Sequence, residues 1–276
     1  MGDNHTTISP QDLISRVGTR DCPIIFDVRR AEVFAEAPDL LPTAKWRDHL
    51  RAQDWGAALP PDRDIVVYCV HGHNVSHGAA ALLRAAGRRV RTLDGGIEGY
   101  RDAGGLVLRK DAIPKRAEAT SSRWITRERP KIDRIACPWF IRRFIDREAE
   151  IHYVPAEWVS DIADEFDAVA FDIPDVLFSH VGEKCSFDAF LDHSGISDPA
   201  LQRLATIIRG ADTGRLDLAP EAAGLLAASL GLSATWRDDL AMMDQSFVLY
   251  DALLGWCRHA ADESHGWPPA PTKMAV

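Results

Sequence analysis

A strand–loop–helix unit in the first half of the chain limits the fold most strongly. Ile65-Val66-Val67-Tyr68 is a β-branched run of the kind that forms a buried parallel strand. An alanine- and leucine-rich run from Ser76 to Ala86 stops at Gly87, as a helix does. The loop between them begins at Cys69, and its backbone N–H groups and the helix dipole favour a thiolate and an anion beside it. We therefore interpret Cys69 as a reactive nucleophile rather than a buried structural cysteine.

Other apolar runs repeat the alternation of strand and helix. Residues 24–28 and 90–93 are short and rich in branched side chains, and each precedes a segment with helical composition. This order predicts an α/β fold with a parallel sheet and helices on both faces. The carboxyl ends of parallel strands meet at one edge of the sheet, so Asp27, Cys69 and Asp94 should gather there.

Three segments of this half resemble a known family. They are Asp27-Val28-Arg29, the loop that follows Cys69, and Leu93-Asp94-Gly95-Gly96-Ile97. Together they resemble a rhodanese-like sulfurtransferase domain. That family carries sulfur as a persulfide on its cysteine, takes it from thiosulfate or a related donor, and passes it to a thiol or another thiophilic acceptor. The resemblance implies that Cys69 is the catalytic nucleophile and that Asp27 and Arg29 brace the catalytic site. It also implies an anion-binding loop made of Val70, His71, Gly72, His73, Asn74, Val75 and Ser76.

The loop departs from the usual rhodanese spacing by one residue. Gly87 lies eighteen positions after Cys69, one more than is usual in the family. If the extra residue lies in the loop, the cradle resembles that of related phosphatases and arsenate reductases, which bind a tetrahedral oxyanion. If it lies in the helix, the cradle is unchanged. The sequence leaves both open, so binding or reduction of chromate or arsenate is the alternative to sulfur transfer.

The second half carries a separate resemblance. We expect a rhodanese-like domain over residues 1–108, a polar linker over 109–122, and a smaller helix-rich α+β domain over 123–276. The second half resembles the chromate-resistance (ChrB-type) protein family. The residues that carry the resemblance are Lys131-Ile132-Asp133-Arg134, Cys137-Pro138-Trp139-Phe140-Ile141, His180, Cys185-Ser186-Phe187-Asp188-Ala189-Phe190 and Arg209-Gly210-Ala211-Asp212. The resemblance implies chromate or sulfate-like oxyanion stress as the setting, without fixing a reaction.

Polar side chains of the second half lie at the ends of expected helices and strands. Four of them, His180, Cys185, Asp188 and Asp212, include ligand types that hold a transition metal. Helix capping and salt bridges to nearby arginines explain the same residues. A transition metal in the second domain is therefore one of two interpretations, and the sequence suggests no other cofactor.

Charge distribution raises a third hypothesis. The chain has a net charge of −9, yet residues 109–147 contain twelve Lys or Arg and five Asp or Glu. Such a basic segment could contact nucleic acid, as in a chromate-responsive transcriptional regulator. The acidic remainder and the lack of a recognisable helix-turn-helix count against nucleic acid as a partner.

Cysteine usage and the N-terminus indicate the compartment. The five cysteines form no CxxC pair, which argues against a disulfide framework. The first residues lack the features of a signal peptide, and no apolar run reaches membrane-spanning length. We expect a cytoplasmic protein without a membrane partner, whose partners are a small-molecule sulfur donor or oxyanion and a thiol acceptor.

Overall fold

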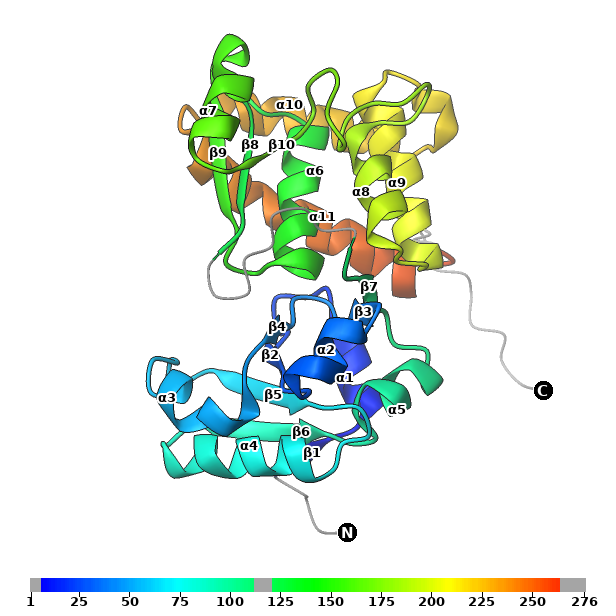
Figure 1. Cartoon of the computed structure of the whole chain (residues 1–276). Helices are drawn as coiled ribbons and strands as arrows, with labels where there is room; N and C mark the ends of the chain where they lie inside the picture. Colours follow the sequence, from blue (N-terminus) through cyan, green and yellow to red (C-terminus); the bar gives the residue numbers. More distant parts are fainter. Residues whose placement is uncertain (1–5, 112–120, 264–276) are drawn as a thin grey trace, which may run out of the picture.

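The computed structural model describes residues 6–111 and 121–263, which fold into two halves that contain both helices and strands (Figure 1). The first half lies below the second in Figure 1, and the two meet along one face of each. Among the described residues, no helix combines the length and the apolar character needed to cross a membrane.

The first half is built on a five-stranded sheet in the order β1-β6-β5-β2-β4, in which every neighbouring pair is parallel. The rhodanese-like parallel sheet expected from the sequence is confirmed. The strands are β1 (Thr7–Ile8), β6 (Arg89–Leu93), β5 (Asp64–Tyr68), β2 (Ile24–Asp27) and β4 (Lys45–Trp46).

Helices cover both faces of this sheet because its central strands are apolar on both faces. Ile25, Val66 and Tyr68 belong to the apolar cluster that includes the helices on one face, whereas Phe26 and Val67 belong to a second cluster on the other. The first face is covered by α1 (Pro10–Arg16) and α5 (Gly96–Asp102), and the second by α3 (Ala52–Gly56) and α4 (Asn74–Ala85). The remaining elements are α2 (Ala31–Glu36), η1 (His49–Arg51), and the antiparallel pair β3 (Asp39–Leu40) and β7 (Leu108–Arg109).

The second half places helices against a three-stranded parallel sheet in the order β10-β8-β9. Its strands are β8 (Arg123–Arg127), β9 (Glu150–Val154) and β10 (Val169–Ala170). The helices are α6 (Asp133–Phe140), its π-helical continuation η2 (Ile141–Ile145), η3 (Ala156–Trp158), α7 (Val159–Glu165), α8 (Ser186–Ser194), α9 (Pro199–Asp212), η4 (Leu216–Leu218), α10 (Ala222–Thr235) and α11 (Asp239–His259). Buried aromatic rings of α6 and α8 pack on one another, and this helix-rich domain also matches the expectation.

The two halves share one continuous apolar core. The Thr43 N–H donates to the Phe144 carbonyl over 2.9 Å, and the Phe144 ring lies against Gly18. The Lys45 ammonium lies 3.3 Å from a carboxylate oxygen of Asp146 in the second half. Most of the linker expected over residues 109–122 lies outside the described residues, and Arg109 pairs with the first half through β7.

A buried ion pair fixes the carboxyl end of the central strands. Asp27 is fully buried and accepts from the Arg29 Nε over 2.8 Å and from the Tyr68 hydroxyl over 2.8 Å. The Tyr68 hydroxyl in turn accepts from the Leu41 N–H over 3.2 Å. Tyr68 immediately precedes Cys69, so this network holds the last residue of β5 in place.

We expect Asp27→Ala to lower the free energy of unfolding by about 3–5 kcal/mol, because it leaves the buried Arg29 guanidinium without its counter-ion. Asp54→Ala is the matched control, because Asp54 is 65% exposed and pairs with Arg51 over 3.1 Å. Its loss should stay within about 1 kcal/mol. Urea unfolding measures both values, and equal losses would show that the Asp27 network does not stabilise the sheet end.

Candidate functional site

Cys69 lies at the carboxyl end of β5, one residue after the strand ends. Its side chain is buried, and Sγ lies 3.3 Å from Ser76 Oγ in the first turn of α4. The Ser76 hydroxyl also lies within donating distance, 3.1 Å, of the His73 carbonyl. A hydroxyl has only one proton to donate. When Cys69 is a thiol, Ser76 can donate to the His73 carbonyl; when Cys69 is a thiolate, Ser76 can donate to Sγ instead.

Helix α5 holds the loop carbonyl groups. The Ile97 N–H donates to the Cys69 carbonyl over 3.0 Å, and the Glu98 N–H donates to the Val70 carbonyl over 3.2 Å. These two bonds connect the first turn of α5 to the first two residues of the loop. The carbonyls of Cys69 and Val70 are therefore turned toward α5.

Two glycines allow this close approach. A Cβ on Gly96 would lie 2.4 Å from the Val70 carbonyl oxygen, and one on Gly72 would lie 2.6 Å from the Leu93 carbonyl oxygen. Both residues also have positive φ, at 61° and 72°, which side chains disfavour. The absence of side chains at these two positions lets the backbone of the Leu93–Ile97 segment pack directly against the backbone of the Cys69 loop.

The backbone N–H groups of residues 70–76 have no hydrogen-bond acceptor within the described part of the chain. The N–H groups at the start of α4 are those that every helix leaves unpaired. The N–H groups of loop residues 70–73 precede them in the chain and are also unpaired within the described residues. Unpaired N–H groups and the positive end of a helix dipole are the features that an anion-binding loop requires. The anion-binding loop expected from the sequence stays a prediction.

The histidines of the loop lie toward solvent. His71 Nδ1 lies 2.7 Å from a Glu98 carboxylate oxygen, and both side chains are more than half exposed. The His71 and His73 ring centroids are 6.0 Å apart. In the described structure neither imidazole contacts Sγ. Asp27 and Arg29 likewise contact Tyr68 and not Sγ, so they position the site rather than touch the reacting atom.

A second constellation lies in the other half, around His180. Its Nε2 lies 3.4 Å from an Asp133 oxygen, 3.3 Å from an Asp172 oxygen and 3.4 Å from an Asp212 oxygen. Asp133 begins α6, Asp172 follows β10, and Asp212 ends α9. We refer to these four residues as the His180 cluster. Asp133 and Asp172 are almost fully buried, whereas the side chain of His180 is 42% exposed.

The carboxylates change the titration of this cluster. A hydrogen bond to Asp133, with the charges of all three carboxylates, raises the pKa of His180 to about 9. Burial, followed by the charges of Asp133 and Asp172, raises the pKa of Asp212 to about 7. The cluster therefore concentrates negative charge in a poorly solvated place.

The structure brings together two of the four metal ligands suggested by the sequence, His180 and Asp212. Cys185 is the N-cap of α8, and burial raises the pKa of its thiol. The Asp188 carboxylate accepts from the Cys185 N–H and forms two hydrogen bonds with Arg209, each 2.9 Å. Capping and salt bridging thus account for Cys185 and Asp188, as the second interpretation of the sequence had it.

Sequence reasoning grouped Asp133 with these polar residues but did not keep it among the four metal ligands, and it did not name Asp172. Asp133 belongs to the segment that resembles the ChrB-type family, and Asp172 directly follows the apolar run 168–171. A carboxylate directly after a short strand was the signal that could have identified Asp172.

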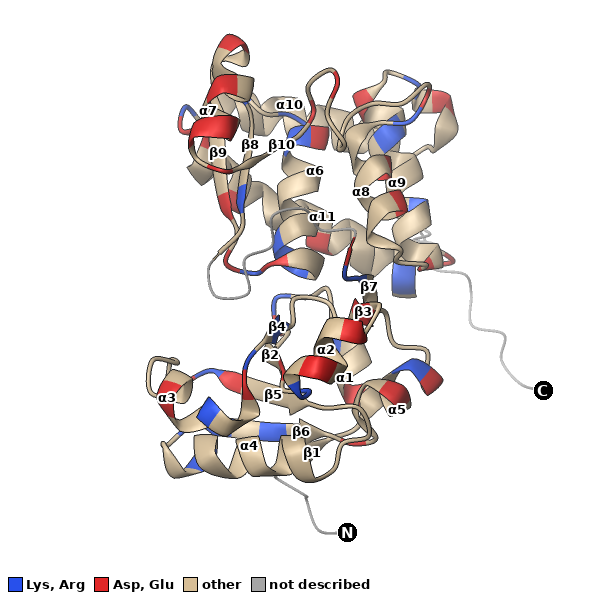
Figure 2. Cartoon of the chain, viewed as in Figure 1, with Lys and Arg blue, Asp and Glu red and all other residues tan. Residues whose placement is uncertain are grey.

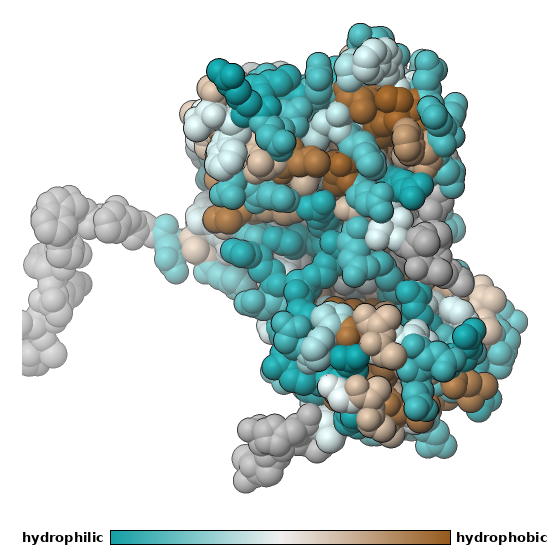
Figure 3. Space-filling view, turned by 90° about the vertical axis from the view of Figure 1, so that its left-hand side faces the viewer, coloured by the Kyte–Doolittle hydropathy of each residue, from teal (hydrophilic) through white to brown (hydrophobic). Residues whose placement is uncertain are grey.

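The basic segment is largely neutralised within the chain. Figure 2 shows acidic and basic residues interspersed over both halves. Seven arginines from the described part of this segment form ion pairs with acidic side chains; they are Arg109, Arg123, Arg127, Arg129, Arg134, Arg142 and Arg143. Figure 3 shows a mostly hydrophilic face interrupted by smaller apolar areas.

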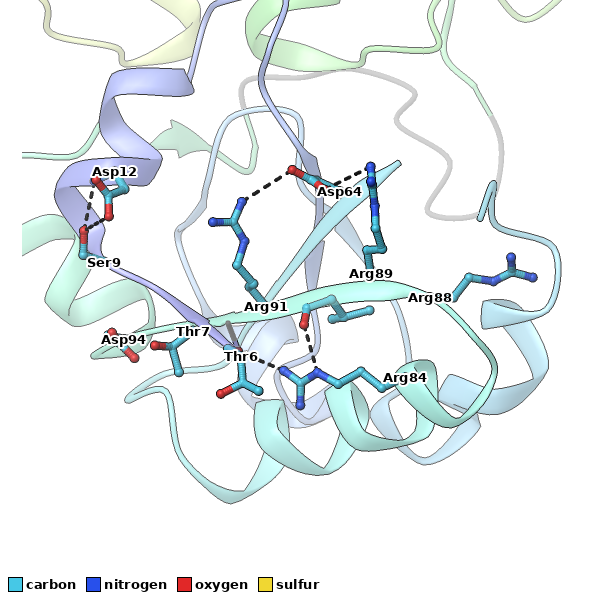
Figure 4. A pocket seen from close by; sticks show the side chains of 11 residues that line it. Thr6, Thr7, Ser9, Asp12, Asp64, Arg84, Arg88, Arg89, Arg91 and Asp94 are labelled. Atoms are coloured by element: carbon cyan, nitrogen blue, oxygen red, sulfur yellow. Dashed lines mark hydrogen bonds and ion pairs between the residues drawn. The ribbon is translucent and has the colours of Figure 1, made fainter. Parts of the chain in front are cut away.

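A hollow of about 730 Å³ lies along β6 at the edge of the first sheet (Figure 4). Arg89 and Arg91 in its wall pair with Asp64, and Arg84 donates to the carbonyls of Thr6 and Val90. These arginines therefore form bonds that stabilise the fold. Cys69 is not among the residues that line the hollow.

Comparisons with known proteins match the two halves of the chain to two different family models. Residues 9–103 match the family model of the rhodanese-like domain, and residues 124–257 match that of the ChrB C-terminal domain. Protein ChrB of Cupriavidus metallidurans is 34% identical over 145 residues, which cover 51% of this chain and only 43% of that protein.

Two solved structures are similar to the first half. A rhodanese-related protein from Thermoplasma volcanium is 21% identical, with a TM-score of 0.33, over 37% of this chain and 97% of its own. The BH2092 protein from Bacillus halodurans is 30% identical, with a TM-score of 0.33, over 37% of this chain and 76% of its own.

We expect Gly96→Ala to disrupt the Cys69 loop, because the new methyl group would displace the Val70 and Cys69 carbonyls. Gly104→Ala is the matched control, because Gly104 also has positive φ, at 82°, but a Cβ there meets nothing within 4 Å. Both variants should lose about 1–2 kcal/mol of stability from the unfavourable backbone conformation. Iodoacetamide labelling of Cys69 should change in rate only in Gly96→Ala, and equal rates in both variants would contradict the role given to Gly96.

Proposed function

From a chain that joins a rhodanese-like domain to a ChrB C-terminal domain, we propose that Cys69 transfers sulfane sulfur through a persulfide. The observation that carries the proposal is the set of unpaired backbone N–H groups of residues 70–76, in the loop that begins at Cys69. A persulfide anion, or the sulfonate end of thiosulfate, can accept hydrogen bonds from these groups. The first turn of α4 adds the positive end of a helix dipole.

The reaction proceeds in two displacement steps. The Cys69 thiolate attacks the outer sulfur of thiosulfate, the sulfur–sulfur bond of thiosulfate breaks, and sulfite leaves with the bonding electron pair. An acceptor thiolate then attacks the terminal sulfur of the Cys69 persulfide, forms its own persulfide and releases the Cys69 thiolate. No external oxidant or reductant is consumed.

Side chains of this chain take defined parts in these steps. Ser76 Oγ, 3.3 Å from Sγ, donates a hydrogen bond to the thiolate before attack and after transfer. The Asp27–Arg29–Tyr68 network fixes the backbone from which Cys69 projects. His71 lies on the solvent side of the loop beside Glu98, where it can exchange a proton with an incoming thiol.

The second half supports a biological setting rather than a second reaction. Its relationship to ChrB links the chain to chromate resistance. Sulfur transfer fits that setting chemically, because chromate consumes thiols and resembles sulfate in shape and charge. A persulfide carrier would supply sulfane sulfur to thiols under such stress.

Binding of an oxyanion at the same loop is the second candidate function, and the unpaired N–H groups favour it as well. The loop has no Lys or Arg between Cys69 and Ser76, so a tetrahedral oxyanion would depend on backbone N–H groups and the helix dipole. Each charge-assisted hydrogen bond contributes about 1.5–3 kcal/mol. A few such bonds are enough for millimolar binding, which corresponds to about −4 kcal/mol.

We expect Cys69→Ser to abolish transfer of sulfur from thiosulfate to cyanide, because a serine hydroxyl does not form a persulfide. Cys257→Ser is the matched control, because Cys257 is a buried side chain of α11 whose thiol pKa is raised to about 11 by burial. It should keep the parent activity. The thiocyanate assay measures both variants, and transfer that persists in Cys69→Ser would remove Cys69 from the mechanism.

We expect phosphate and arsenate to inhibit this transfer competitively with thiosulfate if the loop accepts a tetrahedral oxyanion. Nitrate is the control, because it is a planar monoanion that cannot use the same set of donors. Initial rates of sulfur transfer, measured at fixed ionic strength with each anion in turn, give the inhibition constant of each anion. Weak inhibition of equal size by all three would exclude oxyanion binding and leave sulfur transfer as the function of the loop.

A further inference from the structure

Carboxylate oxygens of three aspartates surround the imidazole of His180, and three residues of the cluster have ligand atoms close enough to share one ion. Three carboxylate oxygens lie 3.3–3.4 Å from one imidazole nitrogen, His180 Nε2. One N–H group donates well to one acceptor at about 2.7–3.2 Å, so a single hydrogen bond does not explain three equal and longer distances. Ligands about 2.1 Å from a tetrahedral metal lie about 3.4 Å from one another.

We propose that Asp133, His180 and Asp212 bind one divalent transition-metal ion, with Asp172 next to His180 beside this set. Ligand atoms of Asp133, His180 and Asp212 lie within 4.8 Å of one another, which a single ion can bridge. Two carboxylates and one imidazole form an oxygen-rich set with one nitrogen. This set suits Mn²⁺ or Fe²⁺ better than the thiolate-rich sets that select zinc or copper.

Hydrogen bonds from outside the cluster orient the buried carboxylates. Asp133 accepts from the Ser186 N–H over 2.8 Å and from the Phe187 N–H over 3.0 Å, both at the start of α8. Asp172 accepts from the Ser186 hydroxyl over 3.0 Å and from Arg127 over 2.7 Å. Such outer contacts fix metal ligands before the ion binds.

The arginine beside the cluster supplies a second observation. Arg127 donates to Asp172 through a terminal nitrogen, while its Nε is buried and has no hydrogen-bond partner within the described residues. A buried donor without an acceptor is costly. The Arg127 side chain is 41% exposed, and its bond to the Asp172 carboxylate holds that residue beside the cluster.

Access to the site comes from the side of His180 and Asp212. The side chains of these two residues are 42% and 19% exposed, whereas those of Asp133 and Asp172 are 2% and 5% exposed. An ion can therefore enter from solvent without opening the core. The same difference makes His180 and Asp212 the better positions for substitution, because neither caps a helix as Asp133 does.

Binding of Mn²⁺ to the full chain tests the proposal. The purified protein is treated with a chelator and titrated with MnCl₂, and free Mn²⁺ is followed by its electron paramagnetic resonance signal. We expect one bound ion per chain and a dissociation constant raised about tenfold or more in His180→Ala and in Asp212→Ala. Zn²⁺ and Mg²⁺ in competition define the metal preference.

Matched variants separate the site from general surface binding. His193→Ala, on α8, and Asp217→Ala, in an exposed pair with Arg215, should bind Mn²⁺ as the parent does. Cys69→Ser should also bind normally, so failure of the metal proposal is distinct from failure of sulfur transfer. Thermal unfolding shows whether each variant is folded, and Mn²⁺ should raise the midpoint of the parent but not of His180→Ala. Absence of saturable binding, or equal binding by His180→Ala and His193→Ala, would overturn the proposal.

Discussion

The close approach between the turn that begins α5 and the Cys69 loop is the contact on which the first site depends. Gly96 and Gly72 leave no room for a Cβ, and the N–H groups of Ile97 and Glu98 hold the first two carbonyls of the loop. With those carbonyls bonded to α5, the N–H groups of residues 70–76 remain without a backbone acceptor in the described chain. The loop conformation thus follows from backbone packing between α5 and the Cys69 loop.

Much of the first half could be predicted from the sequence, because its signals are local. Runs such as Ile65–Tyr68 are apolar on both faces, which only a covered parallel sheet accommodates, and Cys69 directly follows one of them. The roles of Asp27 and Arg29 were harder to separate. Asp27 accepts a hydrogen bond from the Tyr68 hydroxyl, and the Arg29 guanidinium lies over the Tyr68 ring. These contacts depend on the register of β2 against β5, which places Asp27 opposite Tyr68.

The second site could not be predicted in full, because its ligands come from three separate segments. Asp188 and Asp192 have the spacing of ligands on one helix face, yet Cys185 at the N-cap makes Asp188 a capping residue that binds Arg209. Asp133 and Asp172 join His180 only because α8 packs against α6 and β10 pairs with β8. The ion pairs that neutralise the arginines of β8 and α6 also join residues far apart in the sequence. A count of charges within residues 109–147 misses these partners, so it overestimates the positive charge of the segment.

The two sites lie in different halves of a chain that shares one apolar core, and the central claim concerns Cys69. Intact-mass spectrometry after incubation with thiosulfate, followed by peptide mapping, tests that claim most directly. Persulfide formation predicts a gain of about 32 Da, one sulfur atom, on the peptide that contains Cys69. The gain should disappear after treatment with cyanide or a thiol. An unchanged mass, or a gain confined to another cysteine, would contradict the account.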